Sequence, residues 1–234
     1  RAIADEVCAK VLFDAAHLCG MIAGKVWPQP LVEGAHLMTF STYKSLGGPA
    51  GGLIVTNDDE IAQKLDAIAY PGLTANFDAA KTAALGITLQ DWKSVGRDYA
   101  QMMVKTSQAL AQQLQNLGVN IFAADKGFTT SHQFAILAAP YGGGQTAARR
   151  MGEAGLLACG IGLPIEQVEG DLNGLRIGTP EIVRIGMKVE HMQDLAGFIA
   201  RSLDTSAEPK SIQREITEWR KQFSGVHYTV DLPN

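Results

Sequence analysis

Leu37-Met38-Thr39-Phe40-Ser41-Thr42-Tyr43-Lys44-Ser45-Leu46-Gly47-Gly48 joins an apolar strand, a lysine and a glycine-rich turn. A second apolar run upstream, Val11-Leu12-Phe13, is followed by Asp14-Ala15-Ala16-His17. Continuous apolar strands separated by helices predict an α/β fold with a mainly parallel sheet that is covered on both faces. Sheets of this kind bind ligands at the carboxyl ends of their strands. The carboxylate, the imidazole and the lysine are therefore expected at one site.

The rest of the chain divides into two regions of different pattern. Strand and helix alternate up to about residue 105, and a smaller α+β pattern occupies residues 106–234, which predicts two domains. Tyr70-Pro71-Gly72 breaks the first region, and a long helix interrupted at Gln90-Asp91-Trp92 is expected after it. The expected strands are 11–13, 37–40, 53–56, 119–123, 133–137 and 175–177. The expected helices are 1–7, 58–69, 78–117, 144–159, 192–203 and 211–223.

The composition argues against several classes of partner. Of the 234 residues, 46% are hydrophobic and 19% are charged, which is typical of a globular protein. The net charge of -4 and the pI near 5.7 disfavour nucleic acid and anionic membranes as partners. Three cysteines without a CxxC pair predict neither a disulfide framework nor a metal site. With no signal peptide or apolar span in the sequence, a cytoplasmic location is expected.

The residue types at the expected site are those that pyridoxal 5'-phosphate requires. The cofactor needs an amine that condenses with its aldehyde, for which Lys44 is the candidate. It needs a carboxylate that keeps the ring nitrogen protonated, for which Asp14 is the candidate, and His17 and Ser41 are candidates for further contacts. Arg176 offers a guanidinium suited to bidentate capture of an amino-acid carboxylate. The set predicts an enzyme that acts on amino acids.

The residues near the first two strands also have structural interpretations. Lys44 taken alone reads as a surface lysine, and Asp14 as a cap of the helix that follows it. His17 taken alone reads as a hydrogen-bonded structural histidine. These alternatives stay open on the residues alone.

Polar residues elsewhere have structural alternatives too. Ser41 and Thr42 are candidate hydroxyl donors to a cofactor or simply polar strand residues. Arg176 is either a carboxylate ligand or an edge-strand residue in a surface ion pair. The glycine-rich residues 141–146 lack the lysine and the spacing of a phosphate loop, which predicts a flexible turn before a helix.

Three segments together resemble the serine hydroxymethyltransferase family. Residues 13–23, Phe-Asp-Ala-Ala-His-Leu-Cys-Gly-Met-Ile-Ala, are similar to the family's Asp-x-Ala-His-x-x-Gly-Leu-Ile-Ala segment. Residues 39–52 resemble its Thr-Thr-Thr-Thr-His-Lys-Thr-Leu-x-Gly-Pro-Arg-Gly-Gly segment. Residues 175–180 resemble its Arg-x-Gly-Thr-Pro strand. The order and spacing of the three match across most of the chain.

The resemblance implies the aspartate-aminotransferase-like (type I) fold of pyridoxal-phosphate enzymes. Residues 1–105 would then be the C-terminal portion of the large cofactor-binding domain, and residues 106–234 the small C-terminal α+β domain. A homodimer with shared active sites is also implied. The implied roles are cofactor attachment by Lys44, pairing with the ring nitrogen by Asp14, contact with the phenolic oxygen by His17, cofactor contact by Ser41 and substrate carboxylate binding by Arg176.

Four positions depart from the family pattern. Tyr43 stands where the family has histidine, and Ala50 where it has arginine. Residues 71–77 lack most of the glycines of its Pro-Gly-x-x-Gly-Gly-Pro stretch. Ile161 replaces an asparagine that contacts the folate pterin, and an isoleucine cannot supply those hydrogen bonds. Tetrahydrofolate is therefore a possible rather than a required co-substrate.

The predicted reaction makes or breaks the Cα–Cβ bond of a serine-like β-hydroxy amino acid. Serine and glycine, in one-carbon metabolism, or α-methylserine are the expected substrates. A folate-independent threonine-type aldolase or transaldolase is one alternative, and a non-catalytic member acting as a binding or assembly partner is another. The N-terminal half of the family's large domain has no counterpart in these 234 residues, so by themselves they are expected to bind the cofactor poorly and to turn over little.

Overall fold

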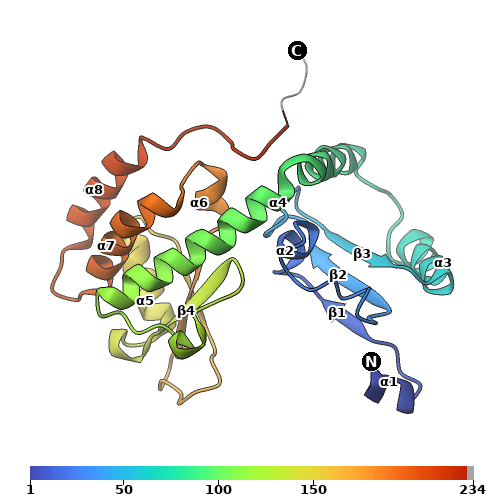
Figure 1. The fold of residues 1–234 in the computed structure, drawn as a ribbon, viewed down its shortest axis with the longest axis horizontal. Coiled ribbons are helices and arrows are strands. Elements are labelled where there is room, and N and C mark those ends of the chain that lie inside the picture. The colour runs from blue at the N-terminus through green and yellow to red at the C-terminus, as the bar shows by residue number, and fades with distance from the viewer. Residues whose placement is uncertain (231–234) are drawn as a thin grey trace. The chain divides into compact units, whose positions relative to one another are not determined.

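The computed structural model describes residues 1–230, which form two compact units. Among the described residues, the first unit contains Arg1–Ala100 and residues 228–230, and the second contains Gln101–His227. Figure 1 shows the helices and strands of both. The domain boundary expected after residue 105 stays a prediction, because a compact unit is not by itself a domain that folds alone.

A three-stranded sheet lies in the first unit, in the order β1-β2-β3 (Figure 1). Its strands are β1 (Leu12–Asp14), β2 (Leu37–Ser41) and β3 (Gly52–Thr56). β1 runs parallel to β2, whereas β3 runs antiparallel to β2. The expectation of a mainly parallel sheet is wrong for β3, because the short turn after Ser41 returns the chain directly beside β2.

The burial of β1 differs from the prediction of a buried strand. Leu12 is 53% exposed and Asp14 is exposed, because β1 lies at the edge of the sheet. The hydrophobic core of this unit lies between the sheet and α2 (Cys19–Ala23). Its buried members are Ala15, Ile22 and Met38. Alternation of exposure along β1 thus places the Asp14 side chain where it can meet a ligand.

Two short helices and a π-type turn also belong to this unit. α1 (Ala2–Glu6) opens the chain, and α3 (Asp59–Ala67) follows β3. Asp58 caps α3 by accepting a hydrogen bond from the Ile61 N–H, and Asp59 and Glu60 place acids in the first turn of the helix. A π-type turn (Ile68–Leu73) contains the predicted break at Pro71.

α4 (Ala79–Asn116) is one continuous helix, so the interruption expected near residues 90–92 is wrong. Tertiary contacts overcome the weak helix preference there. The buried Trp92 indole donates a hydrogen bond to the Leu46 carbonyl, and the buried Asp91 carboxylate accepts one from the Val230 N–H. Gly118, at positive φ, follows the end of α4, as is common after helices.

The second unit has an antiparallel sheet in the order β4-β6-β5. Its strands are β4 (Gln133–Leu137), β5 (Cys159–Ile161) and β6 (Gly174–Gly178). The strand expected at 119–123 is reduced to an isolated bridge between Ile121 and Ile136, since Ala123 adopts a left-handed conformation.

Helices pack beside this sheet. They are α5 (Gly144–Glu153), α6 (Pro180–Arg184), α7 (Met192–Leu203) and α8 (Pro209–Arg220), with short 3-10 turns at Ala124–Lys126, Ala139–Tyr141 and Val189–His191. α5 ends six residues before the expected 159, because Gly155 at positive φ supports a helix stop. α8 buries Ile212 and Ile216. No helix in the described part of the chain is long and apolar enough to cross a membrane.

Candidate active site

The structure brings together the lysine and the histidine that the sequence predicts for one site. Lys44 Nζ lies 3.2 Å from His17 Nε2, within hydrogen-bond distance. Lys44 belongs to the turn that leaves β2, and His17 belongs to the turn that leaves β1. Because β1 and β2 are parallel, both turns lie at the carboxyl edge of this strand pair. Both residues are half-buried, so neither is a free surface side chain.

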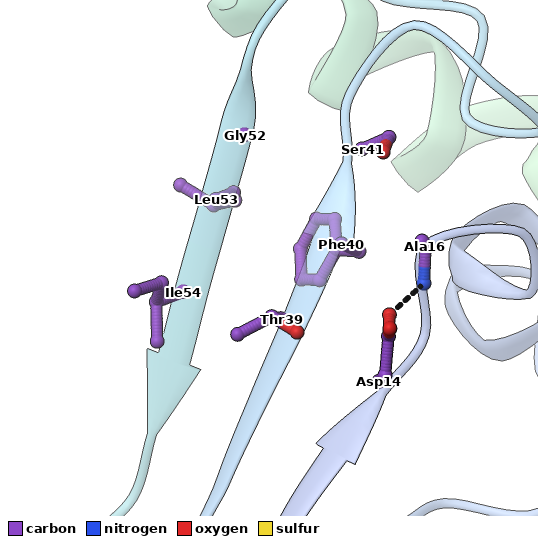
Figure 2. Close-up of a pocket in the computed structure, with 8 residues that line it drawn as sticks. All are labelled: Asp14, Ala16, Thr39, Phe40, Ser41, Gly52, Leu53 and Ile54. Atoms are coloured by element: carbon purple, nitrogen blue, oxygen red, sulfur yellow. Dashed lines mark hydrogen bonds between the residues drawn. The ribbon is translucent and has the colours of Figure 1, made fainter.

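Asp14 and Ser41 line a shallow depression at the same edge (Figure 2). Each is the last residue of its strand, β1 and β2 respectively. Figure 2 shows the dashed hydrogen bond in which Asp14 Oδ1 accepts from the Ala16 N–H at 2.9 Å. The depression holds about 370 Å³ and is lined by Asp14, Ala16 and residues 39–41 and 52–54.

The helix-cap interpretation of Asp14 is wrong. Its carboxylate binds the N–H of Ala16, whereas α2 begins at Cys19 with Leu18 as its cap residue and no side-chain cap bond. The contact is a local turn of the kind that Asp side chains commonly form. The Asp14 carboxylate therefore stays exposed at the depression and forms no capping hydrogen bond to a helix.

Thr42 is a structural residue and not a free hydroxyl donor. Its side chain is buried, and its hydroxyl lies 2.5 Å from the Pro49 carbonyl and 2.9 Å from the Gly51 carbonyl. These bonds close the turn between β2 and β3 around Lys44. Tyr43, in the position where the family pattern has histidine, is 55% exposed.

Sequence reasoning missed one residue of this region, Ser45. Its buried hydroxyl joins the turn that carries Lys44 to the turn that carries His17. The available signal was a hydroxyl residue directly after the lysine, which the resembling family segment also has as threonine. Polar side chains at such positions commonly bond to the backbone of a neighbouring turn.

Arg176 lies in the middle strand of the sheet of the second unit, so the edge-strand interpretation is wrong. It pairs with Ala135 on β4 and with Cys159 on β5. Its side chain is half-buried, and within residues 1–230 no ion pair is formed by it. Its assignment to the substrate carboxylate stays a prediction.

The loop at Ile161 is held by an asparagine that the sequence did not single out. Ile161 is the last residue of β5, opposite Gly174. The buried Asn173 amide donates to the Leu163 carbonyl at 3.0 Å and accepts from the Leu163 N–H at 2.7 Å. It also donates to the carbonyls of Ile165 and Glu166. The polar groups of this loop therefore bond within the protein.

The glycine-rich segment 141–146 ends in α5, as predicted for a turn before a helix. The Asp171 carboxylate occupies the amino end of this helix. It accepts hydrogen bonds from the Gln145 N–H at 2.8 Å, the Thr146 N–H at 2.9 Å and the Thr146 hydroxyl at 2.8 Å. These bonds, led by the one from Gln145, hold the pKa of the Asp171 carboxyl well below its ordinary value.

We expect Asp171→Ala to lower the melting temperature at neutral pH, since it removes the acceptor that satisfies the first N–H groups of α5. A carboxyl whose pKa is lowered by folding stabilises the protein above its unfolded pKa of about 4, and this contribution is lost as the pH falls further. The difference from wild type should therefore shrink below about pH 4. Thermal melts from pH 3 to 8 measure it. Glu169→Ala, which removes an exposed neighbouring carboxylate, is the control, and an equal effect there would contradict the capping role.

The chain matches the family model for serine hydroxymethyltransferase over residues 1–199. The chain belongs to the serine hydroxymethyltransferase family. It is 60% identical over 98% of its length to an α-methylserine aldolase from Variovorax paradoxus, covering 52% of that protein. It is 36% identical over 99% of its length to a serine hydroxymethyltransferase from Methanocella arvoryzae, covering 55% of that protein. The chain thus spans about half the length of these curated relatives.

A solved structure has the same fold. The L-threonine transaldolase from Pseudomonas fluorescens superposes with a TM-score of 0.84, at 25% sequence identity over 94% of this chain and 51% of its own. This enzyme and the family match identify the type I fold of pyridoxal-phosphate enzymes. The fold class expected from the sequence is confirmed.

The side chains at the strand ends fit pyridoxal phosphate. The cofactor has an aldehyde, a basic ring nitrogen and a phenolic oxygen, and it requires an amine, an anion and a donor placed around them. Lys44 would supply the amine and the exposed Asp14 carboxylate the anion, and His17 places a ring nitrogen 3.2 Å from that amine. The fit rests on this donor set, which the end of β1 and the turns after β1 and β2 place at one edge of the sheet.

Proposed function

We propose that the whole protein is a pyridoxal-phosphate enzyme that cleaves the Cα–Cβ bond of α-methylserine and related β-hydroxy amino acids. The observation that carries the proposal is the contact of Lys44 Nζ with His17 Nε2, at the edge of the sheet where β1 ends in Asp14. The identity of 58–60% to several α-methylserine aldolases supports this substrate over serine, since the named serine hydroxymethyltransferases are 35–38% identical.

Each side chain has a task in this proposal. When bound, pyridoxal phosphate supplies an aldehyde for the substrate amine and a ring that accepts the electron pair left at Cα. Lys44 holds the cofactor between turnovers, and His17 positions the Lys44 amine. Asp14 keeps a positive charge on the ring through its carboxylate. Arg176 binds the substrate carboxylate.

The reaction balances without a second substrate. Breaking the Cα–Cβ bond of α-methylserine transfers the hydroxyl proton to the protein and releases formaldehyde, and a proton returned to Cα completes alanine. A folate acceptor for formaldehyde is not required by this balance. The position of Ile161 and the internal bonds of Asn173 support a folate-independent reaction, since this loop offers few free polar groups to a pterin.

The test is a product assay with the whole protein and added pyridoxal phosphate. We expect formaldehyde and alanine from α-methylserine without folate, at a kcat/KM about tenfold or more above that for serine, since a pocket for one methyl group discriminates at this level. Formaldehyde release that depends on tetrahydrofolate would instead identify a hydroxymethyltransferase. Transfer from threonine to a second aldehyde would identify a transaldolase, and no product from any of these amino acids would favour a non-catalytic binding protein.

The homodimer with shared active sites and the cytoplasmic location are part of this proposal. Both come from the resemblance and the composition of the sequence.

A further inference from the structure

Ser45 is buried between the two turns that carry the candidate catalytic groups. Its side chain is 2% exposed. The hydroxyl donates to the His17 carbonyl at 2.7 Å and accepts from the Gly20 N–H at 3.0 Å. Its oxygen also lies 3.3 Å from Cys19 Sγ. One hydroxyl therefore joins the residue after Lys44 to the backbone of two residues, His17 and Gly20, and to the thiol of Cys19.

The two turns approach each other so closely that only glycine fits at one position. A methyl group at Gly20 would overlap the carbonyl group of Ser45. On the other side of Ser45, the Leu46 carbonyl accepts a hydrogen bond of 2.7 Å from the Trp92 indole. Ser45 thus belongs to a segment that is held on both sides. The Ser45 hydroxyl connects this segment to the His17 backbone through its hydrogen bond to the His17 carbonyl.

We propose that Ser45 is a positioning residue that sets the contact between His17 Nε2 and Lys44 Nζ. The His17 carbonyl that Ser45 binds belongs to the same residue as the imidazole, so the bond fixes the backbone from which that ring projects. Loss of this bond frees the turn after β1 to move relative to Lys44. The inference rests on the proposed function, because it concerns the attachment of pyridoxal phosphate to Lys44.

The test is a double-mutant cycle in the whole protein. The amine of Lys44 and the aldehyde of added pyridoxal phosphate condense with loss of one water, and the visible absorbance of the lysine-bound cofactor reports the rate. We expect Ser45→Ala to slow attachment about tenfold, as for loss of one positioning hydrogen bond. We expect His17→Ala to slow it at least as much, and the double variant to match His17→Ala alone.

Matched variants separate positioning from a loss of stability. Ser202→Ala removes another buried hydroxyl, which donates to the Ile199 carbonyl at 2.7 Å in α7, and we expect it to leave the attachment rate unchanged. Ser45→Thr retains the hydroxyl and should restore most of the rate. If Ser45→Ala fails to fold, Ser45→Cys keeps the size of the side chain, weakens its hydrogen bonds and should show the same slowing.

Three outcomes overturn the inference. They are a wild-type rate in Ser45→Ala, a wild-type rate in His17→Ala, and additive effects in the double variant. Failure of the proposed function looks different, because wild-type protein would then attach no pyridoxal phosphate to Lys44 at all. That result would overturn the function and this inference together.

Discussion

Lys44→Ala in the whole protein should abolish the visible absorbance of lysine-bound pyridoxal phosphate and lower kcat by roughly 10³-fold or more. Lys44 Nζ lies 3.2 Å from His17 Nε2 at the carboxyl edge of β1 and β2, the edge at which open α/β sheets generally bind ligands. Alanine has no amine to hold the cofactor covalently or to displace the product. The absorbance spectrum with added pyridoxal phosphate and the assay of formaldehyde from α-methylserine measure the two effects.

Two further variants make this test specific. Lys44→Arg keeps the positive charge but cannot condense with an aldehyde under these conditions, so we expect it to be as inactive as Lys44→Ala. Lys64→Ala removes an exposed lysine on α3 of the same unit and should behave as wild type. Normal turnover by Lys44→Ala would contradict the proposed function. Retained binding to a partner protein with no cofactor signal in wild type would favour the non-catalytic alternative.

Asp14→Asn should lower kcat by roughly 10²- to 10⁴-fold, because the proposed pairing with the ring nitrogen of the cofactor depends on the negative charge. The amide can still accept the hydrogen bond from the Ala16 N–H, so the turn after β1 should keep its geometry. What the variant loses is the negative charge opposite the ring nitrogen of the cofactor. The assay is kcat with saturating α-methylserine.

The control for Asp14→Asn is Asp66→Asn, which removes an exposed carboxylate from α3. We expect wild-type kcat from this control. The cofactor absorbance of Asp14→Asn should persist, because Lys44 is unchanged, and this separates a charge effect from loss of binding. A kcat of Asp14→Asn within about twofold of wild type would show that the carboxylate does not act on the cofactor.

Local patterns in the sequence predicted much of the fold and of the candidate site. β2, β4 and α7 lie where the apolar runs and helical spacing place them. The contact between Lys44 and His17 follows from one rule, that neighbouring parallel strands end at the same edge. Where the sequence misled, the deciding feature was a hydrogen bond or a backbone conformation that hydrophobic periodicity does not encode.

Three elements show this. α4 continues through residues 90–92, where Trp92 is fixed by the Leu46 carbonyl. β3 turns antiparallel because Thr42 closes the preceding turn on the carbonyls of Pro49 and Gly51. The segment at 119–123 has the composition of a strand, yet the left-handed Ala123 ends its pairing. Propensity at each place is a few tenths of a kcal/mol per residue, which such tertiary contacts readily outweigh.

The sequence by itself determined which chemical groups are present and at which strand ends they stand, because hydrophobic periodicity and turn residues act over a few neighbours. Asp14, His17, Ser41 and Lys44 were all identified in this way. Only the tertiary structure decided that the Thr42 hydroxyl bonds within its own turn, that Asp14 caps no helix, and that Ser45 joins the turns after β1 and β2. The bond of Ser45 joins two segments that the chain brings together on folding. The bonds of Asp14 and Thr42 lie within single turns and depend on the geometry of those turns in the folded protein, which hydrophobic periodicity does not encode.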